Sequence, residues 1–188
     1  MTERRLKGIN FVGTLKALER AKGVEVRRAV EASIPGEAGE GLRTGAVVAN
    51  GWYPASWYAA LLASIVHVTS EGEAFVASLS RDAVRADFQT LFKIVRLFIS
   101  PQFALEQSLR VSRRYIDGGE IEVVGVSPTH VHYRMREYHG YTRLMWRDFI
   151  GGVEGVLETM GCRELTSHIL AGGGDGQHHL EFQLRWQA

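Results

Sequence analysis

Two stretches in the last half of the chain alternate polar and apolar residues, and this alternation constrains the fold more than any other feature. In residues 130–136 the polar set is His130, His132, Arg134 and Arg136, and the apolar set is Val131, Tyr133 and Met135. In residues 179–186 the polar set is His179, Glu181, Gln183 and Arg185, and the apolar set is Leu180, Phe182, Leu184 and Trp186. A period of two predicts β-strands with one buried face and one face in water.

Each alternating stretch is the second strand of an expected hairpin. Segments 121–127 and 165–171 supply the first strands, and turns too short for a crossover make both pairs antiparallel. The glycine-rich run AGGGDG, residues 171–176, is followed by a strand and has no lysine nearby. We therefore expect a hairpin turn there and not a phosphate-binding loop.

The remaining segments have helical periodicity. Helices are expected over residues 9–21 and 24–34, ended by Gly23 and Pro35, and over 54–68 after a turn at Asn50 and Gly51. Residues 70–99 are expected to form one helix, or two joined near Ser80, and 36–45 a surface loop. A helix is also expected before each hairpin, at 101–116 and 141–160. The fold class that follows is α+β: a helical N-terminal half, residues 1–99, and an αββαββ unit, residues 100–188, with its antiparallel sheet packed against helices. We expect residues 1–188 to form a single domain.

Composition excludes several classes of function. The formal net charge of the 188 residues is +1 and no run of Lys or Arg exceeds two residues, which argues against nucleic-acid binding. No stretch approaches the roughly 20 apolar residues of a membrane-spanning helix, so no membrane insertion is expected. Cys162 is the only cysteine, so an intrachain disulfide is impossible and a cytoplasmic location is expected.

Aromatic residues mark a candidate ligand site. Trp52, Tyr53, Trp57 and Tyr58 fall within seven residues, a density that is typical either of a core corner or of a small-molecule pocket. The expected lining of an apolar ligand pocket between helices and sheet is Trp52, Tyr53, Trp57, Tyr133 and Trp146. The helix glycines Gly151, Gly152 and Gly155 indicate close packing on the sheet or on another subunit.

The polar strand face is a candidate partner-binding surface. His130, His132, Arg134 and Arg136 could recognise an anion or an acidic protein, because guanidinium groups bind carboxylates well. The alternative is a solvated face with internal ion pairs. A homodimer is compatible with docking through this face or through the glycine-bearing helix.

Metal and catalytic motifs are missing from the sequence. His168, His178 and His179 are weak candidates for a metal, but there is no Cys-x-x-Cys or His-Glu-x-x-His. There is also no nucleophile elbow and no dinucleotide fingerprint. We therefore expect no enzyme, no metal and no cofactor.

Four segments carry a resemblance to known families. KGINFVGTLKAL, GWYPASWYAALL, LRVSRRYIDGGEIEVV and the closing helix and hairpin that end in LEFQLRW together resemble a family of paralogues from myxobacteria. That family is similar to the 4-vinyl-reductase sensor domain and to the heme-nitric-oxide-binding domain. The resemblance implies an α+β ligand-sensing domain, often dimeric, with a pocket between helices and sheet.

The motifs that bind the cofactors of these relatives are incomplete in this chain. The zinc-binding cysteines of 4-vinyl-reductase-like sensors are missing from HILAGGGDGQHHLEF, which offers only His168, His178 and His179. The heme-binding relatives use a helical histidine and a Tyr-x-Ser-x-Arg motif. Here HYRMREY has Tyr133 without the serine, and His67 is the only histidine of the helical half.

The leading hypothesis is a non-enzymatic small-molecule sensor or regulatory module with a mostly apolar pocket. One alternative is a protein–protein adaptor with a packed core. Another is a sensor that depends on a metal or on heme.

Overall fold

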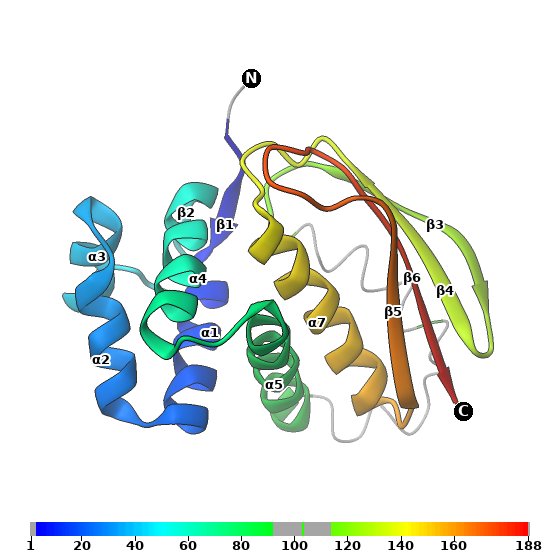
Figure 1. Ribbon diagram of the computed structural model, residues 1–188, viewed down its shortest axis with the longest axis horizontal. Coiled ribbons are helices and arrows are strands. Elements are labelled where there is room, and N and C mark those ends of the chain that lie inside the picture. The colour runs from blue at the N-terminus through cyan, green and yellow to red at the C-terminus, as the bar shows by residue number, and fades with distance from the viewer. Residues whose placement is uncertain (1–2, 92–102, 104–113, 188) are drawn as a thin grey trace.

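The chain folds into three layers, seen from left to right in Figure 1: a helical layer, a pair of helices, and a curved antiparallel sheet. The computed structural model describes residues 3–91, 103 and 114–187. The expected α+β class, with a helical first half and a sheet packed on helices, is confirmed. Most of the helix expected at 101–116, and the end of the helix expected to reach residue 99, lie outside the described residues. The last residues of the first of these, 114–116, form a turn and a bridge and are not helical.

The helical layer contains four helices and a two-stranded ribbon. In chain order its elements are β1 (Arg5–Lys7), α1 (Gly8–Lys22), α2 (Val24–Ser33), α3 (Gly36–Arg43), β2 (Trp52–Pro54) and α4 (Ala55–Thr69). As expected, Gly23 ends α1 and the Ile34–Pro35 pair ends α2. α4 buries Leu61, Leu62 and Ile65, which recur at helical spacing on one face.

Residues 36–45 correct the sequence reading, which expected a surface loop. Residues Gly36–Arg43 form the helix α3, which buries Ala38 and Leu42 against the core. Glycine lowers helix propensity by about 1 kcal/mol relative to alanine. The burial of Ala38 and Leu42 outweighs that low propensity. Glycine is needed at position 39, because a Cβ there would lie 1.9 Å from the carbonyl oxygen of Ile34.

Helices α5 (Glu73–Leu91) and α7 (Arg143–Thr159) form the middle layer. α5 runs through Ser80 without a break. The expected close packing of Gly151 and Gly155 is found, but on α5. A Cβ on Gly151 would lie 2.2 Å from the carbonyl oxygen of Ala77, and one on Gly155 would lie 2.7 Å from that of Arg81. Both glycines are buried inside the chain and are therefore not exposed for docking.

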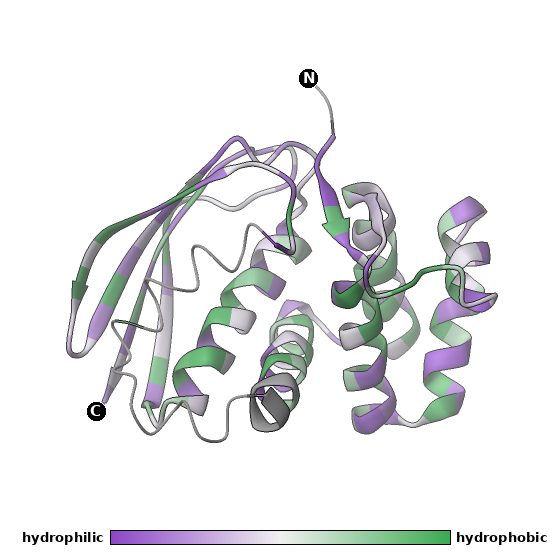
Figure 2. Ribbon diagram, turned by 180° about the vertical axis from the view of Figure 1, so that it is seen from behind, coloured by the Kyte–Doolittle hydropathy of each residue, from purple (hydrophilic) through white to green (hydrophobic). Residues whose placement is uncertain are grey.

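The sheet has the strand order β3-β4-β6-β5, with bounds β3 (Glu120–Ser127), β4 (His130–Arg136), β5 (Arg163–Gly172) and β6 (Leu180–Gln187). All three pairs are antiparallel, and Tyr133 of β4 lies opposite Phe182 of β6. Along β4 the odd-numbered residues Val131, Tyr133 and Met135 are buried, as the alternation predicts. Figure 2 shows hydrophobic and hydrophilic residues alternating along the strands.

The segment Arg4–Lys7 joins the helical layer to the sheet half of the chain. Leu6 pairs with Ile116 in an isolated bridge, and the backbone N–H of Lys7 donates to the carbonyl of Tyr115 at 2.8 Å. Arg4 contributes two bonds, from its backbone N–H to His139 and from its Nε to the Glu137 carbonyl. These contacts hold the two halves together at one end.

Within the described residues no single helix is both long and apolar enough to cross a membrane. α4 and Glu73–Ala86 of α5, which bend by 117° between them, meet the length and composition only as a pair.

Candidate functional site

Three residues predicted to line a ligand pocket lie together in the helical layer. The rings of Tyr53 and Trp57 stack at 5.6 Å, and Tyr53 meets Phe11 edge-on at 5.7 Å. The Tyr53 hydroxyl donates to the Ala46 carbonyl at 3.0 Å and accepts from the Val48 N–H at 2.9 Å. Trp52 is half-buried beneath the Lys7 ammonium, 5.4 Å from its ring centre. Tyr53 and Trp57 pack against the core at this corner.

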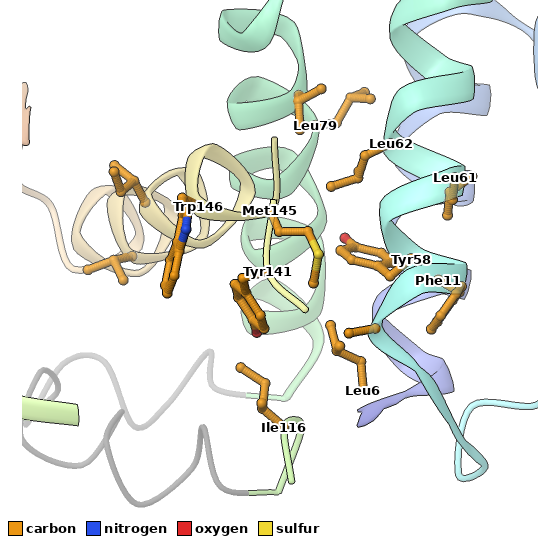
Figure 3. Packing of buried hydrophobic residues seen from close by; sticks show 14 of the residues in the cluster. Leu6, Phe11, Tyr58, Leu61, Leu62, Leu79, Ile116, Tyr141, Met145 and Trp146 are labelled. Carbon is orange, nitrogen blue, oxygen red and sulfur yellow. The ribbon is translucent and has the colours of Figure 1, made fainter. Parts of the chain in front are cut away.

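The other two predicted residues, Tyr133 and Trp146, lie between α7 and the sheet. Tyr133 stacks on Phe182 at 5.3 Å, and Phe149 of α7 meets Phe182 edge-on at 6.2 Å. Trp146 packs against two tyrosines that precede α7, Tyr138 at 5.6 Å and Tyr141 at 4.7 Å. Figure 3 shows Tyr141 and Trp146 together beside α7. We call these six residues the aromatic layer. The five predicted ligand residues thus fall into two separate groups.

Two tryptophans carry buried donors without a partner in the described part of the chain. Nε1 of Trp146 and Nε1 of Trp186 are buried, and neither has a hydrogen-bond partner among the described residues. Buried N–H groups of proteins are nearly always paired, so each such atom calls for an explanation. An oxygen of a ligand or of an ordered water is the simplest partner for the Trp146 donor, which lies in the aromatic layer.

A partly buried carboxyl group, Asp148, lies among the helices and is not indicated by any sequence pattern. The hydroxyl of Tyr58 on α4 donates to Asp148 Oδ1 on α7 at 3.1 Å, and Ser80 on α5 also bonds to the carboxyl. Thr14 of α1 completes the chain with its Oγ1 2.7 Å from the Tyr58 Oη. Figure 3 shows the Tyr58 ring beside Met145, with its oxygen turned away from the α4 backbone. We call Thr14, Tyr58, Ser80 and Asp148 the Asp148 cluster.

Burial dominates the protonation chemistry of this cluster. It raises the pKa of Asp148 to about 7, although hydrogen bonds from Tyr58 and Ser80 act to lower that pKa. Burial also raises the pKa of Tyr58 well above its ordinary value. The pKa of Tyr141 rises in the same way, first through burial and then through Tyr138 and Asp148. Both tyrosines are therefore neutral hydroxyl groups at any ordinary pH. A single aspartate in a helix carries no motif, so only the fold identifies it.

The predicted partner-binding residues lie on the sheet face that points away from α7. Two of them, His132 and Arg134, already bind a carboxylate of the same chain. Glu181 of β6 accepts from His132 Nε2 at 2.8 Å and from Arg134 Nε at 3.0 Å. Arg134 also lies 3.4 Å from Glu122 of β3. The hydrogen bond from Arg134, followed by the one from His132, holds the pKa of Glu181 below its usual range.

The other two predicted partner residues are more accessible. His130 is exposed and bonds through Nδ1 to the Ser127 hydroxyl at 2.5 Å. Arg136 is exposed and has no ion-pair partner among the described residues. It helps to line an open pocket of about 580 Å³ formed by residues 134–137 and 176–181. The polar face therefore combines a satisfied ion-pair centre with a free guanidinium group at one end.

The histidines considered for metal binding do not converge. His168, His178 and His179 are exposed, and the ring of His178 lies 4.4 Å from that of His139. His139 is bound to the Glu137 carboxylate at 3.0 Å. In the part of the chain that the structure describes, no three His, Cys, Asp or Glu side chains are placed to hold a metal ion.

This architecture, a helical layer followed by α5, α7 and a four-stranded antiparallel sheet, is the fold of H-NOX proteins. No protein-family model matches the chain, and no curated protein sequence matches it significantly. Among solved structures, a mutant of the H-NOX protein from K. algicida, in its Fe(II) unliganded form, has a TM-score of 0.72 at 13% identity, covering 97% of both chains.

Two further neighbours agree over the whole length. The S. oneidensis H-NOX protein in the Fe(II)NO ligation state has a TM-score of 0.72 at 12% identity, over 97% of this chain and 100% of its own. A structure from work on the heme redox potential and porphyrin distortion has a TM-score of 0.66 at 14% identity, and the match covers 96% of this chain and 99% of its own. The resemblance to heme-nitric-oxide-binding domains is thus confirmed at the level of fold. The myxobacterial and 4-vinyl-reductase resemblances stay predictions.

These neighbours correct the expectation of no cofactor. Their names specify Fe(II), heme and porphyrin, so heme is the cofactor to which the fold points.

A heme held by histidine does not fit the residues of this chain. All seven histidines lie in the described part, and none of them is buried. His67, on α4, is exposed. Tyr133 matches the tyrosine of a Tyr-x-Ser-x-Arg motif, but Met135 and Glu137 stand where the motif would need Ser and Arg. The fold therefore points to heme, while the donor set lacks the imidazole that commonly binds its iron.

Proposed function

We propose that the chain is a non-enzymatic sensor domain that takes heme, or another flat and largely apolar molecule, against the aromatic layer. We also propose that a protein partner binds the polar sheet face and distinguishes the ligand-bound domain from the free one there. The observation that carries the proposal is the match to heme-containing H-NOX structures over 97% of the chain. The S. oneidensis protein has a structure with NO on its iron, which makes a gas the first signal to test.

The aromatic layer supports the choice of ligand. The rings, such as Tyr133 on Phe182, are buried in the core, so a planar molecule would insert between α7 and the sheet to stack on them. The Trp146 N–H supplies one buried donor for a ligand oxygen. If the ligand is heme, its iron must be held by a group other than histidine, because none of the histidines is buried.

Titration of the purified protein with hemin tests this proposal. We expect a Soret band that saturates at one equivalent, with a spectrum unlike that of a histidine-ligated heme, and a matching mass increase in native mass spectrometry. Trp146→Phe keeps a ring in the layer but removes the N–H, and should weaken binding about fivefold, the value of one hydrogen bond of about 1 kcal/mol.

Trp52→Phe is the matched control, because Trp52 lies in the other aromatic group; it should bind hemin as the parent does. If neither a Soret band nor a mass shift appears, the heme assignment is wrong. If both tryptophan variants weaken binding equally, the assignment to the aromatic layer is wrong.

The output surface is proposed separately. Arg136 and His130 are exposed on the polar face, so an acidic partner could contact them without breaking the Glu181 ion pairs. A second copy of the chain could contact the same two residues only through local carboxylates, because its formal net charge is +1. Sedimentation of the parent and of Arg136→Glu, each at low and high salt, tests whether self-association depends on this face.

A further inference from the structure

The Asp148 side chain is partly buried, and no ion pair to it is found among the residues that the structure describes. Its hydrogen-bond partners, Tyr58 and Ser80, are neutral hydroxyl groups. The neighbouring cations are engaged elsewhere: Arg143 and Arg147 bind the carboxylate of Glu73.

The third cation of this region, Arg81 on α5, is also committed. It binds Glu154 and lies 3.5 Å from Glu158. A carboxylate in such surroundings is costly to ionise, because hydroxyl groups only partly replace the water it has lost.

The hydrogen bonds of the cluster can accommodate either protonation state. When Asp148 is ionised it only accepts, so Tyr58 and Ser80 both donate to it. Tyr58 has then used its only proton, and Thr14 must donate to the Tyr58 oxygen across the 2.7 Å contact. When Asp148 is protonated its O–H donates to one of the two hydroxyls, which can rotate to accept. Protonation therefore removes the charge and leaves no donor stranded.

The position of the cluster gives the proton a structural role. Thr14 and Tyr58 belong to α1 and α4 of the helical layer, whereas Ser80 and Asp148 belong to α5 and α7. The same contact surface holds Leu62 and Leu79, which lie between α4 and α5 in Figure 3. A charge that appears at this point acts on the contact between two layers of the molecule.

We propose that Asp148 is a proton-operated switch between the helical layer and the α5–α7 pair. The protonated acid keeps the layers packed. Loss of the proton leaves a partly buried charge among hydroxyl groups, and this charge is relieved when the layers separate and more water reaches the carboxylate. The inference does not depend on a bound ligand, so its test is independent of the hemin titration.

The first measurement is the ionisation of Asp148 itself, by NMR titration of side-chain carboxyl carbons, assigned by loss of the signal in Asp148→Asn. We expect a midpoint near pH 7, in line with the burial that raises the pKa of Asp148 to about 7. Tyr58→Phe removes a donor to the carboxylate and should move the midpoint to higher pH. A midpoint in the range of ordinary aspartates, near pH 4, would overturn the proposal.

The second measurement is hydrogen exchange of α4 and α7 amides, corrected for the intrinsic pH dependence of exchange. Opening that releases one proton should become about tenfold more frequent per pH unit from pH 5 to 7 and then level off. Asp148→Asn should remove this rise, because the amide keeps the hydrogen bonds and cannot ionise. Asp82→Asn on α5, whose side chain is 53% exposed, is the matched control and should keep the rise. A rise that survives in Asp148→Asn contradicts the switch.

Discussion

Two carboxyl groups of this protein respond to pH in opposite directions because of what surrounds each of them. Glu181 lies on the polar face between Arg134 and His132, and its pKa is lowered. Asp148 lies among hydroxyl groups and its pKa is raised. A lowered pKa stabilises the folded state above the ordinary pKa of the group, and that stability is lost as the pH falls through the folded value. A raised carboxyl pKa does the reverse, so the stability that Asp148 contributes falls as the pH rises towards 7.

The Glu181 arrangement makes a prediction in the acid range. Glu181→Gln removes the charge that Arg134 and His132 stabilise, so the variant should lose less stability than the parent between pH 6 and pH 3. Urea unfolding at each pH measures the difference. Glu122→Gln is the control, because Glu122 is 57% exposed and 3.4 Å from Arg134. Equal slopes for the parent and Glu181→Gln would show that these ion pairs contribute nothing to stability.

At the scale of secondary structure, the crossing of α5 and α7 depends on two glycines. Gly151→Ala places a methyl group 2.2 Å from the Ala77 carbonyl oxygen, a contact that only a shift of the whole helix can relieve. We expect a loss of about 2–3 kcal/mol in the free energy of unfolding, the usual cost of overpacking. Chemical denaturation followed by circular dichroism measures it.

Gly152→Ala provides the comparison on the same helix. A Cβ at Gly152 meets only the Ser80 hydroxyl at 3.3 Å and Val84 at 3.7 Å. The gain in helix propensity, about 1 kcal/mol, should offset most of this contact. If Gly151→Ala lowers the free energy of unfolding no more than Gly152→Ala does, then α5 and α7 do not approach each other as closely as described.

The elements that the sequence predicted well are those with strong periodicity. The β4 and β6 alternation predicted which residues are buried, and the hairpin partners followed from short turns. α3 was missed because its glycines indicate a loop, and only packing against the core makes it helical. The predicted ligand residues were selected by aromatic character alone, which cannot tell the Tyr53–Trp57 corner from the layer around Trp146. Asp148 was missed because its environment is assembled from four helices.

At the scale of the whole molecule, the segment Arg4–Lys7 couples the helical layer to the sheet half. Leu6 is buried, and the backbone of Arg5 and Lys7 bonds to Asp117 and Tyr115. Deletion of residues 1–6 should lower the free energy of unfolding by on the order of 3 kcal/mol, from one buried leucine and several hydrogen bonds. The deletion should also make the amides of α4 and those of α7 differ in their protection from hydrogen exchange.

Hydrogen exchange on the deleted protein, beside a control that lacks only residues 1 and 2, measures both effects. The control should behave as the parent, since the contacts described above begin at Arg4. If α4 and α7 keep the same protection after deletion of residues 1–6, the two layers are coupled by the helix contacts alone.

The partners of this N-terminal segment also set an order of events during synthesis. Arg5 bonds to a residue 112 positions later, and Arg4 to one 133 positions later. A ribosome adds roughly 5–20 residues per second, so the segment waits many seconds before its partners exist. During that interval α1 and α4 have neither β1 contacts to the sheet half nor the Asp148 carboxyl opposite Tyr58. The helical layer therefore lacks these contacts until about residue 148 has emerged, and a chaperone would be expected to engage it until then.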